Sequence, residues 1–183
     1  MKILAISGSL RARSSNTELL RAAALVAPAS WTFDLYDGLG GLPHFNPDLD
    51  AEGSTPPEPV RDLRARVAAA DAVLICSPEY AHGVAGSMKN ALDWLVSDAE
   101  MVGKPVGVLN ASARAGIAHA ALAETLRTMS TALVPGASIT VSIDGRRLDA
   151  AGIAADPTLA SLLQGALDAM AAVISSRSLK PEA

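Results

Sequence analysis

Short apolar runs alternate along this chain with longer segments in which apolar residues recur every three or four positions. Apolar runs at 2–6, 72–76, 105–109 and 137–143 predict buried strands, and the alternating pattern at 31–36 predicts a half-exposed strand. Between and after them, helical spacing predicts helices over 16–26, 61–70, 84–95, 117–129 and 157–174.

Alternation of strands and helices is typical of a parallel sheet that helices cover on both faces. Five such units predict an α/β fold of the flavodoxin-like type, a three-layer α/β/α sandwich with a five-stranded parallel sheet in the order 2-1-3-4-5. Ligands of this fold bind beyond the carboxyl ends of the first and third strands. We expect one domain over residues 1–183, with a frayed polar tail at 175–183.

Composition and charge exclude several classes of partner. Half of the 183 residues are hydrophobic but only 3% are aromatic, so the core must be aliphatic and rich in alanine. A net charge of -4 and a pI of about 5.3 give no electrostatic reason for a nucleic-acid partner or an anionic membrane. A single cysteine, Cys76, fits a reducing compartment. The apolar start is too short for a signal peptide, and no stretch approaches the roughly 20 uncharged residues that span a bilayer, so we expect a cytoplasmic protein.

The loop after the first strand concentrates groups that bind anions. Residues 7–17 read SGSLRARSSNT, and Ser15 with Glu18 has the spacing of a capping box, which predicts a helix N-terminus there. Backbone N–H groups and the helix dipole favour a phosphate at such a point, with Arg11 pairing through its planar fork. The alternative is a well-capped polar turn with solvated arginines; the place of the loop after the first strand favours phosphate. No G-x-G-x-x-G or G-x-x-x-x-G-K-[ST] occurs, which disfavours a dinucleotide-binding Rossmann turn and a kinase or ATPase.

The segment after the third strand reads SPEYAHGVAGSMKNALDWL over 77–95. Together with Gly8-Ser9-Leu10-Arg11, and with LPHFNPDL at 42–49, it resembles the motifs of the NADPH-dependent FMN reductase family, a branch of the flavodoxin-like flavoproteins. The resemblance covers most of the first ~110 residues in the chain order that the fold requires. It implies an enzyme that passes hydride from NADPH, or NADH, through bound FMN to a small-molecule acceptor such as a quinone, an azo compound or free flavin. It also implies a homodimer or homotetramer.

The resemblance also implies where FMN binds. The phosphate lies on the first loop, the turn at Pro78 lies against the isoalloxazine ring, and Tyr80 supplies aromatic surface beside it. Because the cofactor carries the hydride chemistry, we assign no catalytic side chain. The residues expected to bind FMN are Ser9, Arg11, Ser15, Asn16, Thr17, Pro78, Glu79, Tyr80, Ala81, His82, Gly83 and Ser112.

The chain departs from the family pattern at three places. Ala81 stands where the family has asparagine, so the side-chain hydrogen bond that an asparagine offers is absent, and Ala85 replaces a frequent proline. The loop at 110–116 lacks the usual glycine-rich pattern and contains Arg114. These changes leave the FMN affinity and the substrate preference open.

Several other residues have an ordinary structural interpretation. Cys76 ends a buried strand and is expected to be a small apolar residue, and the three histidines show no metal-ligand spacing. Lys89 and Asn90 fit a helix surface or a contact between subunits, and Trp94 fits core packing or such an interface.

Two further functions use the same fold. A flavodoxin-type electron carrier would serve a protein partner, and a regulatory flavoprotein would contact its partner according to redox state. The carrier class is typically strongly acidic and has T-G-N-T in the phosphate loop, where this chain has an arginine.

Overall fold

The chain folds in the predicted alternation of strands and helices. The computed structural model describes residues 1–178. Its strands are β1 (Lys2–Ser7), β2 (Thr32–Tyr36), β3 (Ala72–Cys76), β4 (Glu79–Tyr80), β5 (Gly83–Val84), β6 (Pro105–Asn110) and β7 (Ala132–Thr140). Its α-helices are α1 (Ser15–Val26), α2 (Glu58–Ala69), α3 (Gly86–Leu95), α4 (Gly116–Thr128), α5 (Ala150–Ala155) and α6 (Pro157–Ser178). Short 3-10 segments occupy Gly38–Gly41, Pro47–Leu49 and Ala99–Met101.

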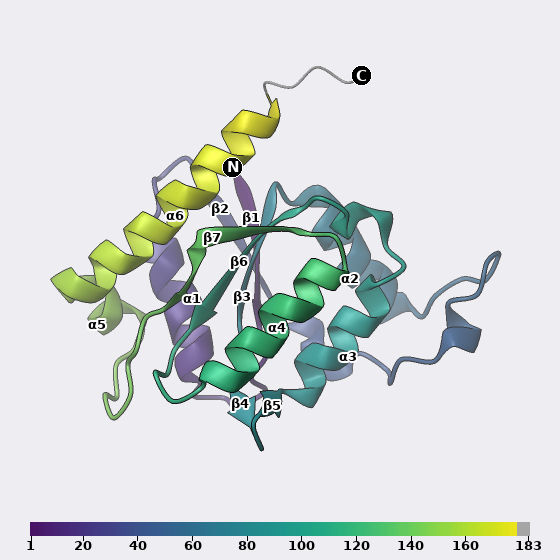
Figure 1. The fold of residues 1–183 in the computed structure, drawn as a ribbon, viewed down its shortest axis with the longest axis horizontal. Coiled ribbons are helices and arrows are strands. Elements are labelled where there is room, and N and C mark those ends of the chain that lie inside the picture. Colours follow the sequence, from purple (N-terminus) through teal and green to yellow (C-terminus); the bar gives the residue numbers. More distant parts are fainter. Residues whose placement is uncertain (179–183) are drawn as a thin grey trace.

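A five-stranded sheet in the order β2-β1-β3-β6-β7 forms the middle layer, and all four neighbouring pairs are parallel. Counted along the chain, this is the predicted order 2-1-3-4-5, so the predicted fold is confirmed. Helices α1, α5 and α6 cover one face of the sheet, and α2, α3 and α4 cover the other (Figure 1). The carboxyl ends of β1, β3 and β6 therefore reach the same edge, where the loops to α1, α3 and α4 lie.

The two faces of the sheet bury different kinds of side chain. The face toward α1 and α6 is rich in alanine, including Ala5, Ala22, Ala72 and Ala166. These small side chains let the helices approach the sheet closely, as expected from a composition with few aromatics. The opposite face holds the larger residues, with Trp94 fully buried among them.

The fifth strand of the sheet differs from the prediction. It runs over 132–140 rather than 137–143, and Pro135 and Gly136 lie inside it. Strand β7 is at the edge of the sheet, where a proline without an N–H donor is tolerated. Its pairing with β6 is irregular there: Val106 pairs with Leu133, but Val108 pairs with Ser138.

Helix α6 is longer and more apolar than the sequence pattern predicts. It continues to Ser178, so the predicted tail begins too early, and the remainder at 179–183 lies outside the described residues. Pro157–Arg177 contains a window of mean hydropathy 1.4, of which 28% is buried, so by length and composition alone this helix could cross a membrane. The window includes Asp168, so it is not an uncharged run, and the core helix of a soluble protein can have the same length and composition. In the fold, one side of α6 packs into the alanine-rich core through Leu163 and Met170, both fully buried.

Candidate functional site

The first loop, residues 8–14, leads directly into α1. The N-cap is Ser14, whose Oγ accepts a hydrogen bond from the Thr17 N–H at 3.3 Å, so the predicted capping role of Ser15 was wrong by one residue. Glu18 does not close a capping box. Its carboxylate accepts from the Ala150 N–H at 2.9 Å and from Arg21 at 2.6 Å. Ser14 thus caps the Thr17 N–H, which leaves the N–H groups of Ser15 and Asn16 at the carboxyl edge of the sheet, since the first donors of a helix have no partner within it.

The first loop and the segment after β3 touch each other. The Gly8 N–H donates to the Cys76 carbonyl at 2.9 Å, and the Ser87 hydroxyl donates to the Gly8 carbonyl at 2.9 Å. A Cβ atom at Gly8 would overlap the Ser77 hydroxyl and would lie 3.1 Å from Ser77 Cα, so only glycine permits this approach. The contact fixes the two turns side by side.

The segment after β3 forms a small hairpin that the sequence did not predict. Strands β4 and β5 pair antiparallel around Ala81 and His82, whose φ angles are 50° and 60°. Two residues with positive φ make the tight turn that favours asparagine and glycine, and Ala-His is an unfavourable sequence for it. The hairpin is attached to α4 through Glu79, whose Oε2 accepts from the Ala118 N–H at 2.8 Å while Oε1 lies 3.0 Å from His82 Nδ1.

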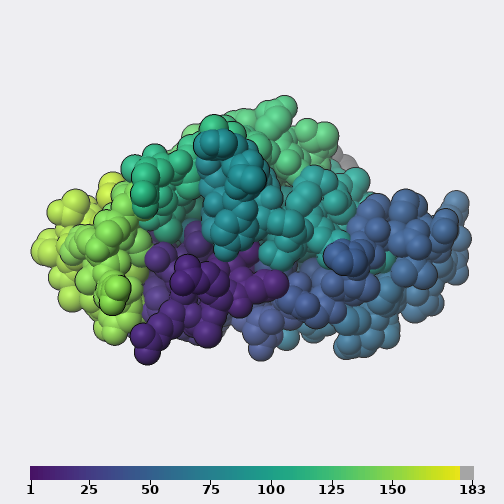
Figure 2. Space-filling model, turned by 90° about the horizontal axis from the view of Figure 1, so that it is seen from below, coloured from purple at the N-terminus to yellow at the C-terminus, as the bar shows by residue number. Residues whose placement is uncertain are grey.

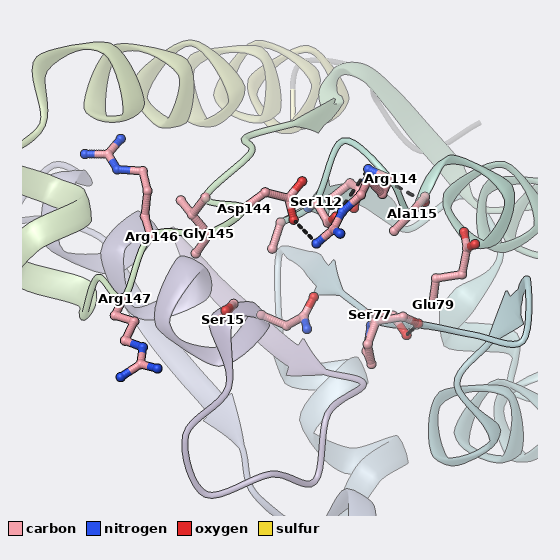
Figure 3. Close-up of a pocket in the computed structure, with 15 residues that line it drawn as sticks. Ser15, Ser77, Glu79, Ser112, Arg114, Ala115, Asp144, Gly145, Arg146 and Arg147 are labelled. Carbon is pink, nitrogen blue, oxygen red and sulfur yellow. Dashed lines mark hydrogen bonds and ion pairs between the residues drawn. The ribbon is translucent and has the colours of Figure 1, made fainter.

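A cavity of about 740 Å³ opens between these loops (Figure 3). Five of the predicted cofactor-binding residues line it, namely Ser15, Asn16, Pro78, Glu79 and Ser112. Figure 2 shows this edge of the molecule, with the purple first loop beside the yellow-green segment that leads into α5.

The other predicted site residues lie around this cavity rather than in its lining. Arg11 lines a second hollow next to it, and Ser9 and Thr17 border a third hollow toward β2, where the Thr17 hydroxyl donates to the Ser7 hydroxyl at 2.8 Å. Tyr80, Ala81, His82 and Gly83 form the hairpin tip, and the Tyr80 side chain is exposed.

Apart from Ser112, the sequence did not predict the wall that follows β6 and β7. Asn110 and Ala111 line the cavity at the end of β6, and the residues at 143–147 line it beyond β7. The rule applied to the sequence places ligands beyond the first and third strands, whereas these two segments follow the fourth and fifth strands.

Asp144 organises the wall beyond β7. It accepts from the Ala113 N–H at 2.9 Å, and Arg114 lies 3.5 Å from its other oxygen. Hydrogen bonds from Ser112, then Ser142 and the Ala113 N–H, hold the pKa of Asp144 below its ordinary value. In the same way, hydrogen bonds from the Ala118 N–H and His82 lower the pKa of Glu79. Both carboxylates bordering the cavity are thus ionised and already hydrogen-bonded.

The lining fits a ligand with one anionic end and one flat apolar end. Near α1 it offers Ser15, Asn16 and the open N-terminus of the helix, with Arg11 in the adjoining hollow. Beyond β3 and at the end of β6 it adds the apolar side chains of Pro78 and Ala111, of which Ala111 lies between the polar residues Asn110 and Ser112 in the chain. FMN has a phosphate at one end and a largely apolar ring at the other, so the donor set matches this cofactor.

Cysteine and histidine take no ligand-like arrangement. Cys76 is fully buried, and burial raises the pKa of its thiol. The thiol lies 3.2 Å from Asn16 Oδ1. Within residues 1–178, no group of three or more histidine, cysteine or acidic side chains is placed to hold a metal ion.

The motifs at 42–49 and 86–95 meet each other away from the cavity, in what we call the outer clamp: residues 43–50 with Arg64, Asn90, Trp94 and Ser97. The Pro43 carbonyl accepts from Asn90 at 2.9 Å and from the Trp94 indole at 2.8 Å, and Phe45 N–H donates to Asn90 at 2.8 Å. Arg64 donates to Asp50 at 2.9 Å and to the Trp94 carbonyl. Core packing of Trp94 is therefore confirmed, and Asn90 holds a loop within its own chain.

Known proteins resemble this chain over nearly its whole length. A family model described as NADPH-dependent FMN reductase matches residues 1–145. A Pseudomonas aeruginosa protein named NAD(P)H-dependent FMN reductase is 36% identical over 175 residues, covering 93% of each chain. A 2-hydroxy-1,4-benzoquinone reductase from a Burkholderia species is 33% identical over 183 residues, covering 97% of this chain and 98% of that protein.

A solved structure agrees with these sequences. The flavoenzyme FerB of Paracoccus denitrificans, an NAD(P)H:(acceptor) oxidoreductase, superposes with a TM-score of 0.78 at 32% identity, covering 96% of this chain and 97% of FerB. The predicted enzyme class and the predicted cofactor pair, FMN with NAD(P)H, are those of the matched family. The chain therefore belongs to the NADPH-dependent FMN reductase family.

Proposed function

We propose that this protein holds FMN in the cavity beyond β1, β3 and β6 and passes electrons from NADPH, or NADH, to a small oxidised acceptor such as a quinone, an azo compound or free flavin. The observation that carries the proposal is the cavity itself, which joins an anion-binding helix start to an apolar end at the ligand-binding edge of this fold. When bound, FMN supplies the chemistry, since its ring accepts hydride and gives the electrons up again.

The anionic end is assigned to the phosphate of FMN. The open first turn of α1 and the hydroxyls of Ser9 and Ser15 offer hydrogen bonds, and helix N-termini favour phosphate. Arg11 is exposed, and within the described residues no carboxylate pairs with its guanidinium, which leaves both edges of the fork for phosphate oxygens. Asn16 and Thr17 complete this end.

The apolar end is assigned to the ring. Pro78 and Glu79 line the cavity, and the hairpin tip with Tyr80, Ala81, His82 and Gly83 stands beside its mouth. Ser112 closes the opposite wall, where its hydroxyl is held by the Arg114 N–H and Asp144. Backbone N–H groups around the ring would stabilise the negative charge of its reduced form.

No side chain is proposed as a catalytic acid or base. Glu79 and Asp144 are the carboxylates at the cavity, and both have lowered pKa values because they accept several hydrogen bonds. Their contribution is to position the hairpin and the loop after β6. Protons for the reduced acceptor would come from solvent at the open mouth.

The acceptor class is supported by the relatives, because one is named a benzoquinone reductase and others are named quinone reductases. These names do not favour the electron carrier or the redox-dependent regulator. We further propose that the chain works as a single domain in a homodimer or homotetramer in the cytoplasm, in keeping with one buried free thiol.

The visible spectrum of the purified protein tests this function directly. We expect flavin absorption bands after incubation with FMN, bleaching on anaerobic addition of NADPH, and return of the bands on addition of a benzoquinone. Protein that binds no flavin in a fluorescence titration would refute the cofactor site. Protein that binds flavin but is not bleached by either nicotinamide would refute the donor and would revive the electron-carrier alternative.

A further inference from the structure

A second hollow, of about 690 Å³, adjoins the proposed FMN cavity. The two share Ser15, Arg146 and Arg147 in their walls, so they lie side by side. The second hollow lies between the first loop and the segment before α5, on the side away from the hairpin. Its lining consists of Arg11, Arg13, Ser14, Ser15, Glu18, Arg146, Arg147, Leu148 and Asp149.

The charges in this hollow do not cancel. Of its four arginines, Arg146 pairs with Asp156 at 2.8 Å and points away from the cavity (Figure 3). The guanidinium groups of Arg13 and Arg147 make no ion pair or hydrogen bond within residues 1–178, and both residues are exposed.

The two carboxylates of the lining are engaged elsewhere. Both oxygens of Glu18 are used, one by Arg21 and one by the Ala150 N–H. Asp149 Oδ1 caps α5 through the Gly152 N–H at 2.8 Å. Arg11 is assigned to the FMN phosphate. Arg13 and Arg147 therefore remain as two arginines with unpaired guanidinium groups in the hollow beside the cofactor cavity.

We propose that Arg13 and Arg147 bind the 2′-phosphate of NADPH and thereby make this reductase prefer NADPH to NADH. The proposal rests on the proposed function, because the nicotinamide must reach the ring in the first cavity while the adenosine end extends beyond it. A 2′-phosphate is a terminal monoester, which two arginine forks bind well, and it is the group that distinguishes NADPH from NADH.

The test uses Arg13→Gln, Arg147→Gln and the double variant, with Arg61→Gln on α2 as an exposed control that removes the same charge. Calorimetry with adenosine 2′,5′-bisphosphate and adenosine 5′-monophosphate, each with and without FMN, measures the phosphate preference without turnover. We expect the double variant to bind the bisphosphate at least about tenfold more weakly, with monophosphate binding unchanged. The ratio of kcat/KM for NADPH to that for NADH should fall by the same factor, and Arg61→Gln should change neither.

Three results would overturn the assignment. Equal losses for both nucleotides would place the arginines on the shared diphosphate or 5′-phosphate, and a loss of FMN affinity would place them on the cofactor phosphate. Unchanged binding of both nucleotides would mean that the arginines are merely solvated. If the wild type fails to bind flavin, the proposed function fails, but the nucleotide titration without FMN still tests Arg13 and Arg147 independently.

Discussion

The outer clamp and the cavity edge are both built from motifs shared with the same family, yet their polar groups are used differently. In the clamp, the Asn90 amide bonds Pro43 and Phe45 on its two sides, and Arg64 is shared between Asp50 and the Trp94 carbonyl. At the cavity edge, by contrast, the guanidinium groups of Arg11 and Arg13 lack protein partners within the described residues.

We interpret the paired groups of the clamp as needed for folding and, under the proposed function, the unpaired groups of the cavity edge as needed for the ligand. Polar groups that satisfy one another hold the loop at 43–50 against α3. Unpaired donors at a rigid edge are costly unless something binds them or water covers them. Motif resemblance alone cannot make this distinction, whereas the hydrogen-bond partners can.

The largest effect is expected in the clamp. Replacing the fully buried Trp94 with alanine should lower the free energy of unfolding by about 3–5 kcal/mol, through lost packing, a cavity and the lost bond to Pro43. Urea unfolding measures this loss. Trp31→Ala is the matched control, because Trp31 is only partly buried and should cost less. The Trp94→Ala protein could still fold but lose more free energy of FMN binding than free energy of unfolding. That result would contradict the division between the two regions.

The next effect concerns the cavity edge. Arg11→Ala should raise the Kd for FMN by about tenfold to a hundredfold, because a charge-assisted pair with phosphate is lost. The free energy of unfolding should stay within about 0.5 kcal/mol of the wild type, since the exposed side chain has no protein partner to lose. Flavin fluorescence quenching and urea unfolding measure the two quantities. Unchanged flavin affinity would sink the phosphate assignment.

The smallest effect is expected for two carboxylates, Asp50 in the outer clamp and Asp144 at the cavity edge. The hydrogen bond from Arg64 lowers the pKa of Asp50, and that from Ser112 lowers the pKa of Asp144, each from an ordinary value of 3.8. Because the pKa of each carboxyl group is lower in the folded state, each ionised group adds stability above pH 3.8. This stability is lost as the pH falls through the folded-state pKa.

Substitution by asparagine should remove that pH-dependent part. We expect Asp50→Asn to cost about 1 kcal/mol at pH 7 and Asp144→Asn less, because the side chain of Asp50 is 8% exposed and that of Asp144 is 30% exposed. Both differences from the wild type should shrink in unfolding measurements at about pH 3. A larger loss for Asp144→Asn would reverse the ranking of the two regions.

Periodicity was enough to predict the sheet, because five buried or half-buried strands separated by helices leave few parallel arrangements. It failed where local sequence and tertiary context disagree. The fifth strand was predicted to begin at 137, but Pro135 and Gly136 lie inside the edge strand β7, and Ala81 and His82 adopt a turn that usually requires asparagine or glycine.

The site was predicted in part, for a related reason. Residues that follow correctly placed strands, such as Asn16 and Pro78, do line the cavity. The wall at 143–147 was missed, since the ligand rule for this fold points to the loops after the first and third strands, whereas this wall follows the fifth. The role of Asn90 was also beyond sequence reasoning, because its partners lie 45 and 47 residues away in the chain.

The close approach of Gly8 to Ser77 has a consequence for how fast a ligand can come and go. The two backbones are in contact and are joined by hydrogen bonds at Cys76 and Ser87. The two turns therefore form one preorganised binding surface and do not need to close around a ligand. Little ordering entropy is then lost on binding, which favours tight association without a slow rearrangement. A side chain larger than hydrogen at position 8 would push the two turns apart. We expect the first effect to be a shorter residence time of the bound flavin.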